Sequence, residues 1–348
     1  MTQSATILVT GGAGFIGSHT CLELLNHGYE IVVVDDYSNS SPRALEHVQK
    51  LAGRPLTAYE VDIRDRDALG EVFAAHPVDA VIHFAAKKAV RESMQIPLTY
   101  YDVNVGGTAT LLRVMEAHRV QQLVFSSSCS IYGRAELLPL DEDATAAPTN
   151  PYTRSKWFCE QMIADACVRY PGLSVIALRY FNPVGAHPSG ELGEDPYGVP
   201  DNLMPYLAQV AVGRLDEVAI FGSDYPTPDG TCVRDYIHVV DIADGHRLAL
   251  EHLTDERGMR CLNLGTGRGV SVLQLVEAFS EASGTSVPFR LAGRRPGDVP
   301  ELVADPSRVE RAWGWHTTRD LAEMCRDAWR FQSQNPAGYV GVGERAAR

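Results

Sequence analysis

A glycine-rich segment near the start of the chain restricts the fold more than any other feature of the sequence. A short apolar run at residues 6–10 is typical of a buried parallel strand, and residues 18–27 have a helical pattern. Between them lies Gly11-Gly-Ala-Gly-Phe-Ile-Gly17, which fits both Gly12-x-Gly14-x-x-Gly17 and Gly11-x-x-Gly14-x-x-Gly17. Either spacing allows a tight turn, close backbone approach to a pyrophosphate and close packing of helix on strand. The segment therefore predicts a dinucleotide-binding unit with the phosphates at the helix N-terminus.

An acidic pair indicates which dinucleotide binds. A second apolar run, residues 29–34, ends in Asp35-Asp36, at about 18 to 20 positions beyond the glycines. A carboxylate at this distance accepts a hydrogen bond from a ribose hydroxyl and repels a 2′-phosphate. The sequence therefore favours NAD over NADP.

Strands and helices alternate through the first half of the chain. Further strands are expected just before residue 61, at 80–85, at 122–127 and at 173–180, with helices at 65–76, 100–117 and from 152 onward. Ser41 and Pro42 fit the N-cap and first position of a short helix. This alternation predicts an α/β fold with a doubly wound parallel sheet of the Rossmann type, whose ligands bind at the carboxyl ends of the strands.

The composition and the length of the expected elements change after residue 182. Residues 183–201 are rich in glycine, proline and acidic residues, and only short helices and strands follow. We expect an NAD-binding domain at 1–183 and a smaller α/β substrate-binding domain at 184–348. Residues 234–264 have the pattern of a return to the large sheet, so the boundary is expected to be discontinuous.

Composition excludes several classes of protein. The net charge of −13 disfavours binding to nucleic acid or to an anionic membrane surface. No apolar run approaches the ~18 residues of a membrane span, and a strand beginning near residue 6 leaves no room for a signal peptide. The seven cysteines are scattered without a C-x-x-C pair, which favours reduced thiols and a cytoplasmic location. Because no metal-ligand spacing appears among the eleven histidines, no metal site is expected.

The segment Tyr152-Thr-Arg-Ser-Lys156 suggests the chemistry. Pro151 fits the first turn of a helix, so Tyr152 and Lys156 lie at i and i+4 on one face. A free tyrosine, with a pKa of about 10, is a poor base at neutral pH, but a nearby ammonium lowers that pKa. Beside a nicotinamide, this pair can move a proton while the cofactor moves a hydride. Alone, Tyr-x-x-x-Lys is common by chance; the cofactor-binding context gives it weight.

Together with the serine run Ser126-Ser-Ser-Cys-Ser-Ile-Tyr-Gly133, these features resemble the extended short-chain dehydrogenase/reductase family. Four later segments are similar to the UDP-glucose 4-epimerases of that family: Arg179-Tyr-Phe-Asn-Pro183, Asn202-Leu-Met-Pro-Tyr206, Asp229-Gly-Thr-Cys-Val-Arg-Asp-Tyr-Ile-His-Val239 and Arg294-Arg-Pro-Gly-Asp298. The resemblance covers residues 6 to 335. This chain departs from it with Cys129, Ser130 and Cys232, which are small-for-small changes, and with Leu302, where many relatives have tyrosine.

The resemblance implies that a UDP-hexose is inverted at C4 through a transient 4-keto sugar. Tyr152 would take the O4 proton, Ser128 would hydrogen-bond O4 and relay that proton, and Lys156 would hold the nicotinamide ribose. The alternative role for Ser128 is to cap the strand end.

The resemblance also implies which residues bind the cofactor and the nucleotide sugar. Residues expected at the NAD site are Gly11, Gly14, Phe15, Ile16, Gly17, Asp35, Asp36, Asp62, Ile63, Phe84, Ala85, Lys88, Asn104, Ser126, Tyr152, Lys156 and Tyr180. Lys88 is equally compatible with a surface lysine. Residues expected at the substrate are Ser128, Asn182, Asn202, Leu203, Arg234, Arg295, Asp298 and Leu302. The two arginines suit a diphosphate, because a guanidinium donates two hydrogen bonds at once.

Other activities of the same scaffold remain alternatives. A 4,6-dehydratase needs an additional acid/base pair after the serine, where this chain has Cys129-Ser130. An epimerase for N-acetylated or uronate sugars, an NAD-linked alcohol dehydrogenase and a non-catalytic NAD sensor are the others; sensors typically lose the tyrosine or lysine, and both are present here. The resemblance further implies a homodimer that pairs through the helices at 100–117 and 152–170. It also implies that Leu302 lines the pocket in which the sugar turns.

Overall fold

The computed structural model describes residues 5–134, 137–255, 257–295 and 297–339, which pack as two compact units. The first contains the described residues of 1–133, 145–180 and 243–262, and the second contains those of 134–144, 181–242 and 263–348. Compared with the domain boundaries expected from the sequence, residues 134–144, 181–183, 234–242 and 263–264 lie in the second unit. For 134–144 the reason is strand-like pairing, because Leu140 forms a bridge with Ala304.

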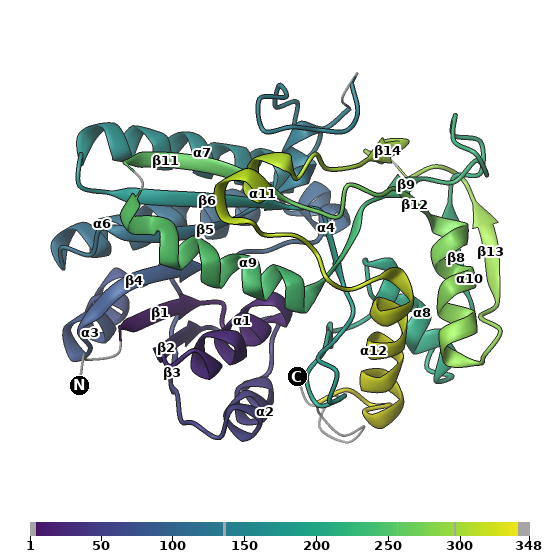
Figure 1. Cartoon of the computed structure of the whole chain (residues 1–348), viewed down its shortest axis with the longest axis horizontal. Coiled ribbons are helices and arrows are strands. Elements are labelled where there is room, and N and C mark those ends of the chain that lie inside the picture. Colours follow the sequence, from purple (N-terminus) through teal and green to yellow (C-terminus); the bar gives the residue numbers. More distant parts are fainter. Residues whose placement is uncertain (1–4, 135–136, 256, 296, 340–348) are drawn as a thin grey trace. The chain divides into compact units, whose positions relative to one another are not determined.

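The first unit is built on a seven-stranded sheet with the order β11-β6-β5-β4-β1-β2-β3 (Figure 1). Neighbouring strands from β6 through β3 are parallel. The bounds are β1 Thr6–Thr10, β2 Glu30–Asp35, β3 Thr57–Glu60, β4 Val78–His83, β5 Gln122–Ser128, β6 Ser174–Tyr180 and β11 Gly258–Leu264. The strand order reverses between β1 and β4, and in sheets of this kind ligands bind at the carboxyl ends of the strands beside such a reversal. The predicted doubly wound α/β fold is confirmed.

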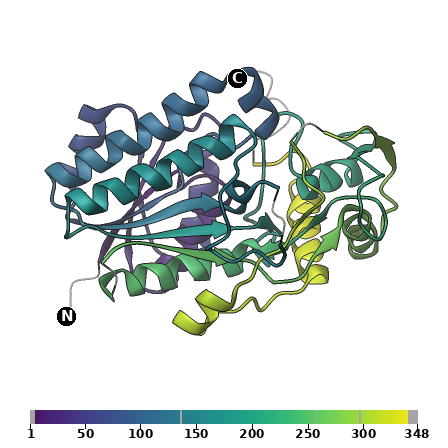
Figure 2. The same ribbon diagram turned by 90° about the horizontal axis from the view of Figure 1, so that it is seen from above.

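Helices cover both faces of this sheet. In Figures 1 and 2, α6 (Gly107–Ala117) and α7 (Pro151–Arg169) lie on one face, and α1 (Phe15–Asn26) and α9 (Val239–His252) lie on the other. The remaining helices up to β5 are α2 Pro42–Ala52, α3 Arg66–Ala75, α4 Val90–Gln95 and α5 Pro97–Tyr100. As predicted, Ser41 caps α2 by accepting a hydrogen bond from the Arg43 N–H, and Pro42 is its first residue.

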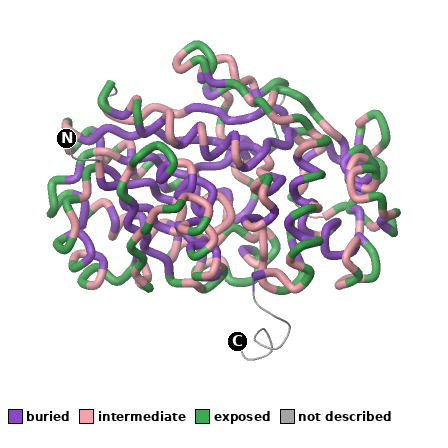
Figure 3. The backbone as a smooth tube through the Cα atoms, turned by 60° about the horizontal axis from the view of Figure 1, so that its bottom comes forward, coloured by how far each residue is buried: buried purple, intermediate pink, exposed green. Residues whose placement is uncertain are grey.

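The helix expected at 100–117 is divided. A π-helical segment, Tyr101–Gly106, separates α5 from α6. At its end the backbone passes close to the sheet, since a Cβ on Gly107 would lie 2.4 Å from Ile63 Cδ1. Buried stretches of the chain are purple in Figure 3, and an apolar core that joins the sheet to α3, α6 and α7 includes Leu111, Phe125 and Ile163.

The second unit has three small sheets. β7 (Asn182–Val184) pairs in parallel with β10 (Tyr236–His238), and β8 (Val218–Phe221) pairs in parallel with β13 (Phe289–Ala292). β9 (Val233–Arg234) lies between β12 (Val270–Ser271), which is antiparallel to it, and β14 (Glu301–Leu302), which is parallel. The helices are α8 Leu203–Ala211, α10 Val272–Ser283, α11 Ser307–Trp313 and α12 Leu321–Gln334. An apolar core joins α8, α10 and α12.

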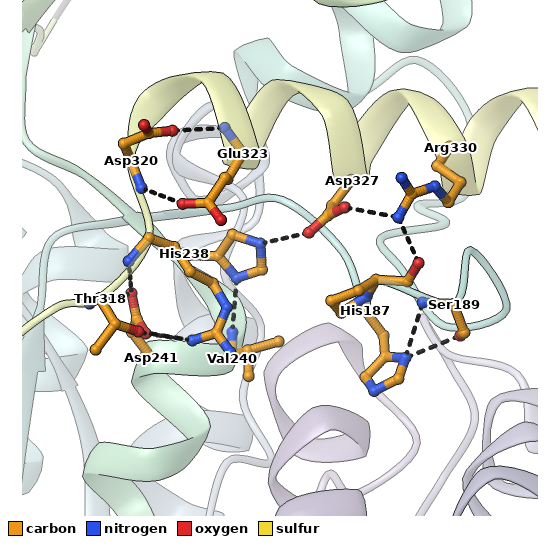
Figure 4. A network of polar contacts seen from close by, with 12 residues as sticks. His187, Ser189, His238, Val240, Asp241, Thr318, Asp320, Glu323, Asp327 and Arg330 are labelled. Carbon is orange, nitrogen blue, oxygen red and sulfur yellow. Dashed lines mark hydrogen bonds and ion pairs between the residues drawn. The ribbon is translucent and has the colours of Figure 1, made fainter.

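A polar network ties α12 to the end of β10 (Figure 4). Asp327 lies 3.4 Å from His238 Nε2 and also pairs with Arg330, while Asp241 accepts a hydrogen bond from Thr318 and pairs with Arg319. Among the residues that the structure describes, no helix combines the length and hydrophobicity needed to span a bilayer.

Candidate active site

The glycine turn leaves no room for side chains on its inner side. Gly11 has φ +69°, and a Cβ there would lie 2.6 Å from the Ala85 nitrogen. A Cβ on Gly17 would lie 2.3 Å from the Gly11 carbonyl oxygen. Gly14 is the N-cap of α1, and within the described part of the chain no side chain caps this helix. The first N–H groups of α1, at Phe15 and Ile16, therefore have the position and polarity of an anion site.

Asp35 is the acidic residue that touches this turn. Its buried carboxylate accepts hydrogen bonds from the Ala13 N–H at 2.9 Å, the Tyr37 N–H at 3.0 Å and the Ser40 hydroxyl at 2.7 Å. Burial raises the pKa of Asp35, and these hydrogen bonds oppose the rise. Asp36 is exposed and instead accepts from the Ser38 backbone and side chain. Of the two predicted carboxylates, Asp35 is thus the one held against the turn.

Asp62 and Ile63 follow β3 and differ in what they present. The Asp62 carboxylate forms an ion pair with Arg64, whose hydrogen bonds lower the pKa of Asp62. The Ile63 side chain is buried in the core below Gly107. At Ile63, therefore, only the backbone can contact a ligand outside the core.

The segment after β4 lies beside the glycine turn and is fixed by Asn104. The N–H groups of Phe84 and Ala85 donate to Thr10, to its carbonyl oxygen at 2.9 Å and to its hydroxyl at 3.3 Å. The Asn104 side-chain amide accepts a hydrogen bond from the Lys87 N–H and donates to the Lys87 carbonyl. It also donates to Ser155 Oγ at 2.8 Å. Asn104 is buried, so its side chain acts on the loop and on α7. Lys88 is exposed.

The proposed catalytic residues meet at the carboxyl end of β5. The capping box of Asn150 and Thr153 starts α7, which places Tyr152 and Lys156 over that strand end. Lys156 Nζ donates to the Ser126 carbonyl at 2.7 Å, and the Ser128 side chain lies close enough to Tyr152 to lower the pKa of its hydroxyl. Ser128 Oγ also lies 2.8 Å from Ser130 Oγ.

Burial dominates the electrostatics of this group. It raises the pKa of Tyr152 to about 12, although the hydrogen bond from Ser128 lowers it. Burial also lowers the pKa of Lys156 to about 8, and the neighbouring acidic groups of Cys159 and Glu160 oppose this fall. The sequence predicts that Lys156 lowers the pKa of Tyr152. In the chain by itself the shift has the opposite direction, because desolvation of the phenolate outweighs the favourable contacts.

A buried ion pair that was not predicted from the sequence lies next to this site. Glu160 Oε2 lies 2.6 Å from Arg179 Nη2, and its other oxygen accepts from the Ser127 hydroxyl at 2.5 Å. Arg179 also donates to Tyr132 Oη at 3.1 Å. The signal was present, since Glu160 is one helical turn after Lys156 and Arg179 opens the Arg-Tyr-Phe-Asn-Pro segment. The adjacent Tyr180 hydroxyl is hydrogen-bonded to Ser126 Oγ.

The second unit holds the other candidates. Arg234 and Leu302 are direct partners in the β9–β14 pairing, and Arg234 Nη1 donates to the Val233 carbonyl at 2.8 Å. Arg295 pairs with Asp298 at 3.1 Å, and its guanidinium lies 5.4 Å from the centre of the Phe221 ring.

The remaining candidates of this unit lie on two other elements. Asn182 begins β7, and its N–H donates to the Asp235 carbonyl. Asn202 is the N-cap of α8 and donates to Glu194 at 3.1 Å; Leu203 is the first residue of that helix.

Comparisons with known proteins identify the family. Residues 7–265 match the model of the NAD dependent epimerase/dehydratase family. The chain is 56% identical over 333 residues to the UDP-glucose 4-epimerase of Bacillus subtilis (strain 168), covering 96% of this chain and 98% of the relative. It is 52% identical over 340 residues to the UDP-glucose 4-epimerase of Homo sapiens, again covering 96% and 98%.

A solved structure gives the same answer. The UDP-glucose 4-epimerase from Bifidobacterium longum, in complex with NAD+ and UDP, superposes with a TM-score of 0.94 at 49% identity, covering 96% of this chain and all of that one. The resemblance to UDP-glucose 4-epimerases that the motifs indicate is thereby confirmed. The chain belongs to the NAD dependent epimerase/dehydratase family.

Proposed function

We propose that this protein inverts the configuration at C4 of UDP-hexoses, interconverting UDP-glucose and UDP-galactose with NAD as its cofactor. The observation that carries the proposal is the meeting of Ser128, Tyr152 and Lys156 at the sheet edge to which the glycine turn belongs. The near full-length similarity to UDP-glucose 4-epimerases supports the same activity.

The described residues fit NAD. Gly11 and Gly17 allow the backbone of the turn to pack closely against Ala85 and α1, and the uncapped start of α1, at Phe15 and Ile16, supplies N–H groups for a pyrophosphate. Asp35 retains acceptor capacity for a ribose hydroxyl beyond its three hydrogen bonds. When bound, NAD supplies the acceptor and donor of the C4 hydride, and the oxidised nicotinamide adds a positive charge. Further residues proposed to hold it are Asp62, the backbone of Ile63, Phe84, Ala85, Lys88, Ser126 and Tyr180, with Lys156 at the ribose, and Asn104 as their support.

Tyr152 is the proposed general base and acid. It removes the O4 proton as the sugar is oxidised and returns it as the sugar is reduced, so no proton is consumed. The Ser128 side chain lies close enough to Tyr152 to lower its pKa, and from this place its hydroxyl can bond O4 and relay the proton. The Lys156 ammonium favours the phenolate form by its charge and can donate to ribose hydroxyls, since one of its three protons is used by Ser126.

The second unit provides the groups that suit the UDP part. Arg234 and Arg295 are half-buried guanidinium groups, which bind phosphate oxygens bidentately. Asp298 orients Arg295. We assign Asn182, Asn202 and Leu203 to the nucleotide and Leu302 to the sugar pocket.

A 4,6-dehydratase is the less well supported activity. Elimination needs an acid/base pair next to the serine, and here Cys129 is buried while Ser130 bonds Ser128. Neither side chain has the required acidity.

The test uses purified protein with its retained NAD. We expect conversion of UDP-galactose to UDP-glucose without added NAD and without accumulation of NADH. An alcohol dehydrogenase would need exchangeable NAD and would accumulate NADH, and a sensor would bind NAD without turnover. Absence of conversion by protein with confirmed bound NAD would contradict the proposal.

We also propose a homodimer. Phe158 and Val168 on α7 and Leu98 on α5 are exposed apolar residues, and the Phe158 ring stacks on Tyr101 at 5.9 Å. Phe158 and Val168 lie within residues 152–170, for which the family resemblance implies pairing, and Leu98 lies just before residues 100–117; a second copy would cover all three. Light scattering at micromolar concentration is expected to give twice the chain mass of 38.0 kDa. A value of one chain mass would contradict the dimer.

We propose a cytoplasmic location. None of the seven cysteines, all of which the structure describes, forms a disulfide, and six are buried, which suits a reducing compartment. Cell fractionation tests this directly, and recovery of the protein outside the cytoplasmic fraction would contradict it.

A further inference from the structure

A buried histidine joins the glycine turn to the helices behind it. His83 is the last residue of β4 and is 2% exposed. Its Nδ1 lies 2.6 Å from the hydroxyl of Thr10, the residue before Gly11. Its Nε2 lies 3.0 Å from the hydroxyl of Thr108 in the first turn of α6. One ring therefore connects two elements on which the proposed site depends.

The neighbouring hydrogen bonds determine which ring nitrogen carries the proton. The Thr108 hydroxyl donates to the Asn104 carbonyl at 2.6 Å, so its oxygen accepts from His83, which requires a proton on Nε2. In a neutral imidazole the other nitrogen is then an acceptor. Nδ1 accepts from the Thr10 hydroxyl, whose oxygen in turn accepts the Ala85 N–H at 3.3 Å. The Thr10 hydroxyl, the His83 ring and the Thr108 hydroxyl thus each donate one hydrogen bond, and all three bonds run in the same direction.

The network continues through Asn104, whose backbone carbonyl accepts from Thr108, to the backbone of Tyr152. Asn104 Nδ2 donates to Ser155 Oγ at 2.8 Å, and the Ser155 hydroxyl donates to the Tyr152 carbonyl at 2.7 Å. The path thus runs from Ala85 through Thr10, His83, Thr108, Asn104 and Ser155 to Tyr152. It joins the segment beside the glycine turn to the first turn of the catalytic helix.

Burial and a nearby positive charge keep the His83 ring neutral, which is the form that this network requires. Burial and the Lys156 ammonium on α7 both lower the pKa of His83, to about 3. Cys159 contacts Thr108, and burial raises the pKa of its thiol, so it carries no charge at neutral pH. A protonated ring would place a second donor against the Thr10 hydroxyl and would break the direction of the chain.

We propose that neutral His83 is a positioning residue for the reaction: it sets the distance between the cofactor-binding turn and the Tyr152 turn of α7. The inference rests on the proposed function, because that separation matters only if cofactor and base act on one substrate atom. Misplacement by about 1 Å can cost about 10²-fold in rate. Loss of the bridge should therefore affect kcat more than KM.

Two variants of different polarity test this. His83→Gln retains one acceptor and one donor and does not titrate, whereas His83→Leu removes both and keeps the site apolar. We expect kcat of His83→Leu to fall ~10²-fold with KM for UDP-galactose within a few-fold of wild type, and His83→Gln to recover most of kcat. A wild-type kcat in His83→Leu, or equal losses in both variants, would overturn the proposal.

Two measurements do not depend on turnover. Nitrogen NMR of the His83 ring should show the Nε2–H tautomer at neutral pH, and an Nδ1–H or doubly protonated ring would overturn the proposal. The lowered pKa contributes stability that is complete above pH 6.5, its ordinary value, and is lost as pH falls toward about 3. The thermal midpoint of His83→Gln should therefore fall less than that of wild type between pH 6.5 and 4, and parallel curves would count against the proposal. If wild type shows no epimerase activity, the proposed function fails, and these two results still test the neutral His83 network separately from it.

Discussion

The two units hold their candidate residues in different ways. In the first unit, Lys156 and Asn104 are buried and hydrogen-bonded to backbone carbonyls, so their positions are set before any ligand binds. In the second unit, the Arg295 side chain is 33% exposed and is paired with Asp298 three residues along the chain. Proton and hydride transfer demand fixed geometry, whereas a diphosphate can be bound by accessible cations. Substitutions in the first unit should therefore change kcat, and those in the second should change KM.

The largest effect is expected at Tyr152. Tyr152→Phe removes the hydroxyl while keeping the ring, so the rate should fall ~10²- to 10⁴-fold, the range of general acid–base catalysis. KM and retained NAD should change little, and the thermal midpoint serves as the folding control. A rate close to wild type would remove Tyr152 from the mechanism and would contradict the expectation that substitutions in the first unit change kcat.

Lys156→Met separates two effects at the same site. The variant loses the charge that favours the phenolate and a donor to the ribose, so both kcat and the amount of retained NAD should fall. Measuring NAD released on gel filtration distinguishes this from Tyr152→Phe. Full retention of NAD would mean that Lys156 does not hold the cofactor.

The next effect concerns stability. Glu160→Gln leaves the Arg179 charge buried without its partner, and breaking a buried pair costs about 3–5 kcal/mol in the free energy of unfolding. The double variant Glu160→Gln/Arg179→Met should lose less than the sum of the two single variants, because it leaves neither charge alone. Urea unfolding measures all three. Additive losses would show that the two side chains do not act as a pair.

Features of the fold and site that depend on residues close together in the sequence could be predicted, whereas features that depend on distant residues could not. The strand–turn–helix pattern at 6–27 and the cap at Ser41 are local, and both fold class and cap are confirmed. The choice between Asp35 and Asp36 depends on which carboxylate reaches Ala13, a contact across 22 residues. Motif spacing placed both near the ribose and had no means of separating them.

The direction of the pKa shift of Tyr152 shows the same limit. The i, i+4 spacing of Tyr152 and Lys156 predicts an attraction between the phenolate and the ammonium, and it contains no information on burial. Burial arises from the packing of α7 on the end of β5, and it dominates the shift in the chain alone. The π-helical turn at Tyr101–Gly106 and the links from Asn104 to Ser155 also depend on tertiary contacts.

A smaller effect is expected in the second unit. Arg234→Lys or Arg295→Lys keeps the charge and loses the bidentate fork, so KM for the UDP-sugar should rise ~10- to 150-fold, which corresponds to about 1.5–3 kcal/mol for a hydrogen bond to a charged group. Arg290→Lys is the matched control, since Arg290 is an exposed residue that pairs with Glu217, just before β8. A fall in kcat at unchanged KM would contradict the assignment of binding to this unit.

The smallest effect is expected at Leu302. This position tests the shape of the proposed sugar pocket, whereas the arginines test charge. Leu302 is a buried residue that lies opposite Arg234 in the β9–β14 pairing, so the sugar pocket proposed for it would adjoin a diphosphate arginine. Leucine lacks the bulk of a tyrosine and offers no hydrogen bond. We therefore expect a preference for the plain hexose with detectable turnover of UDP-N-acetylhexosamines.

Leu302→Tyr should narrow the pocket and strengthen that preference. Discrimination by apolar bulk is worth about 1–3 kcal/mol, or roughly 10- to 200-fold in the ratio of kcat/KM values. Leu302→Met, which nearly conserves volume, is the control and should leave the ratio close to wild type. Both substrate pairs are measured for all three proteins. An unchanged ratio in Leu302→Tyr would mean that Leu302 only packs within its unit and that the loop backbone sets the size of the sugar pocket.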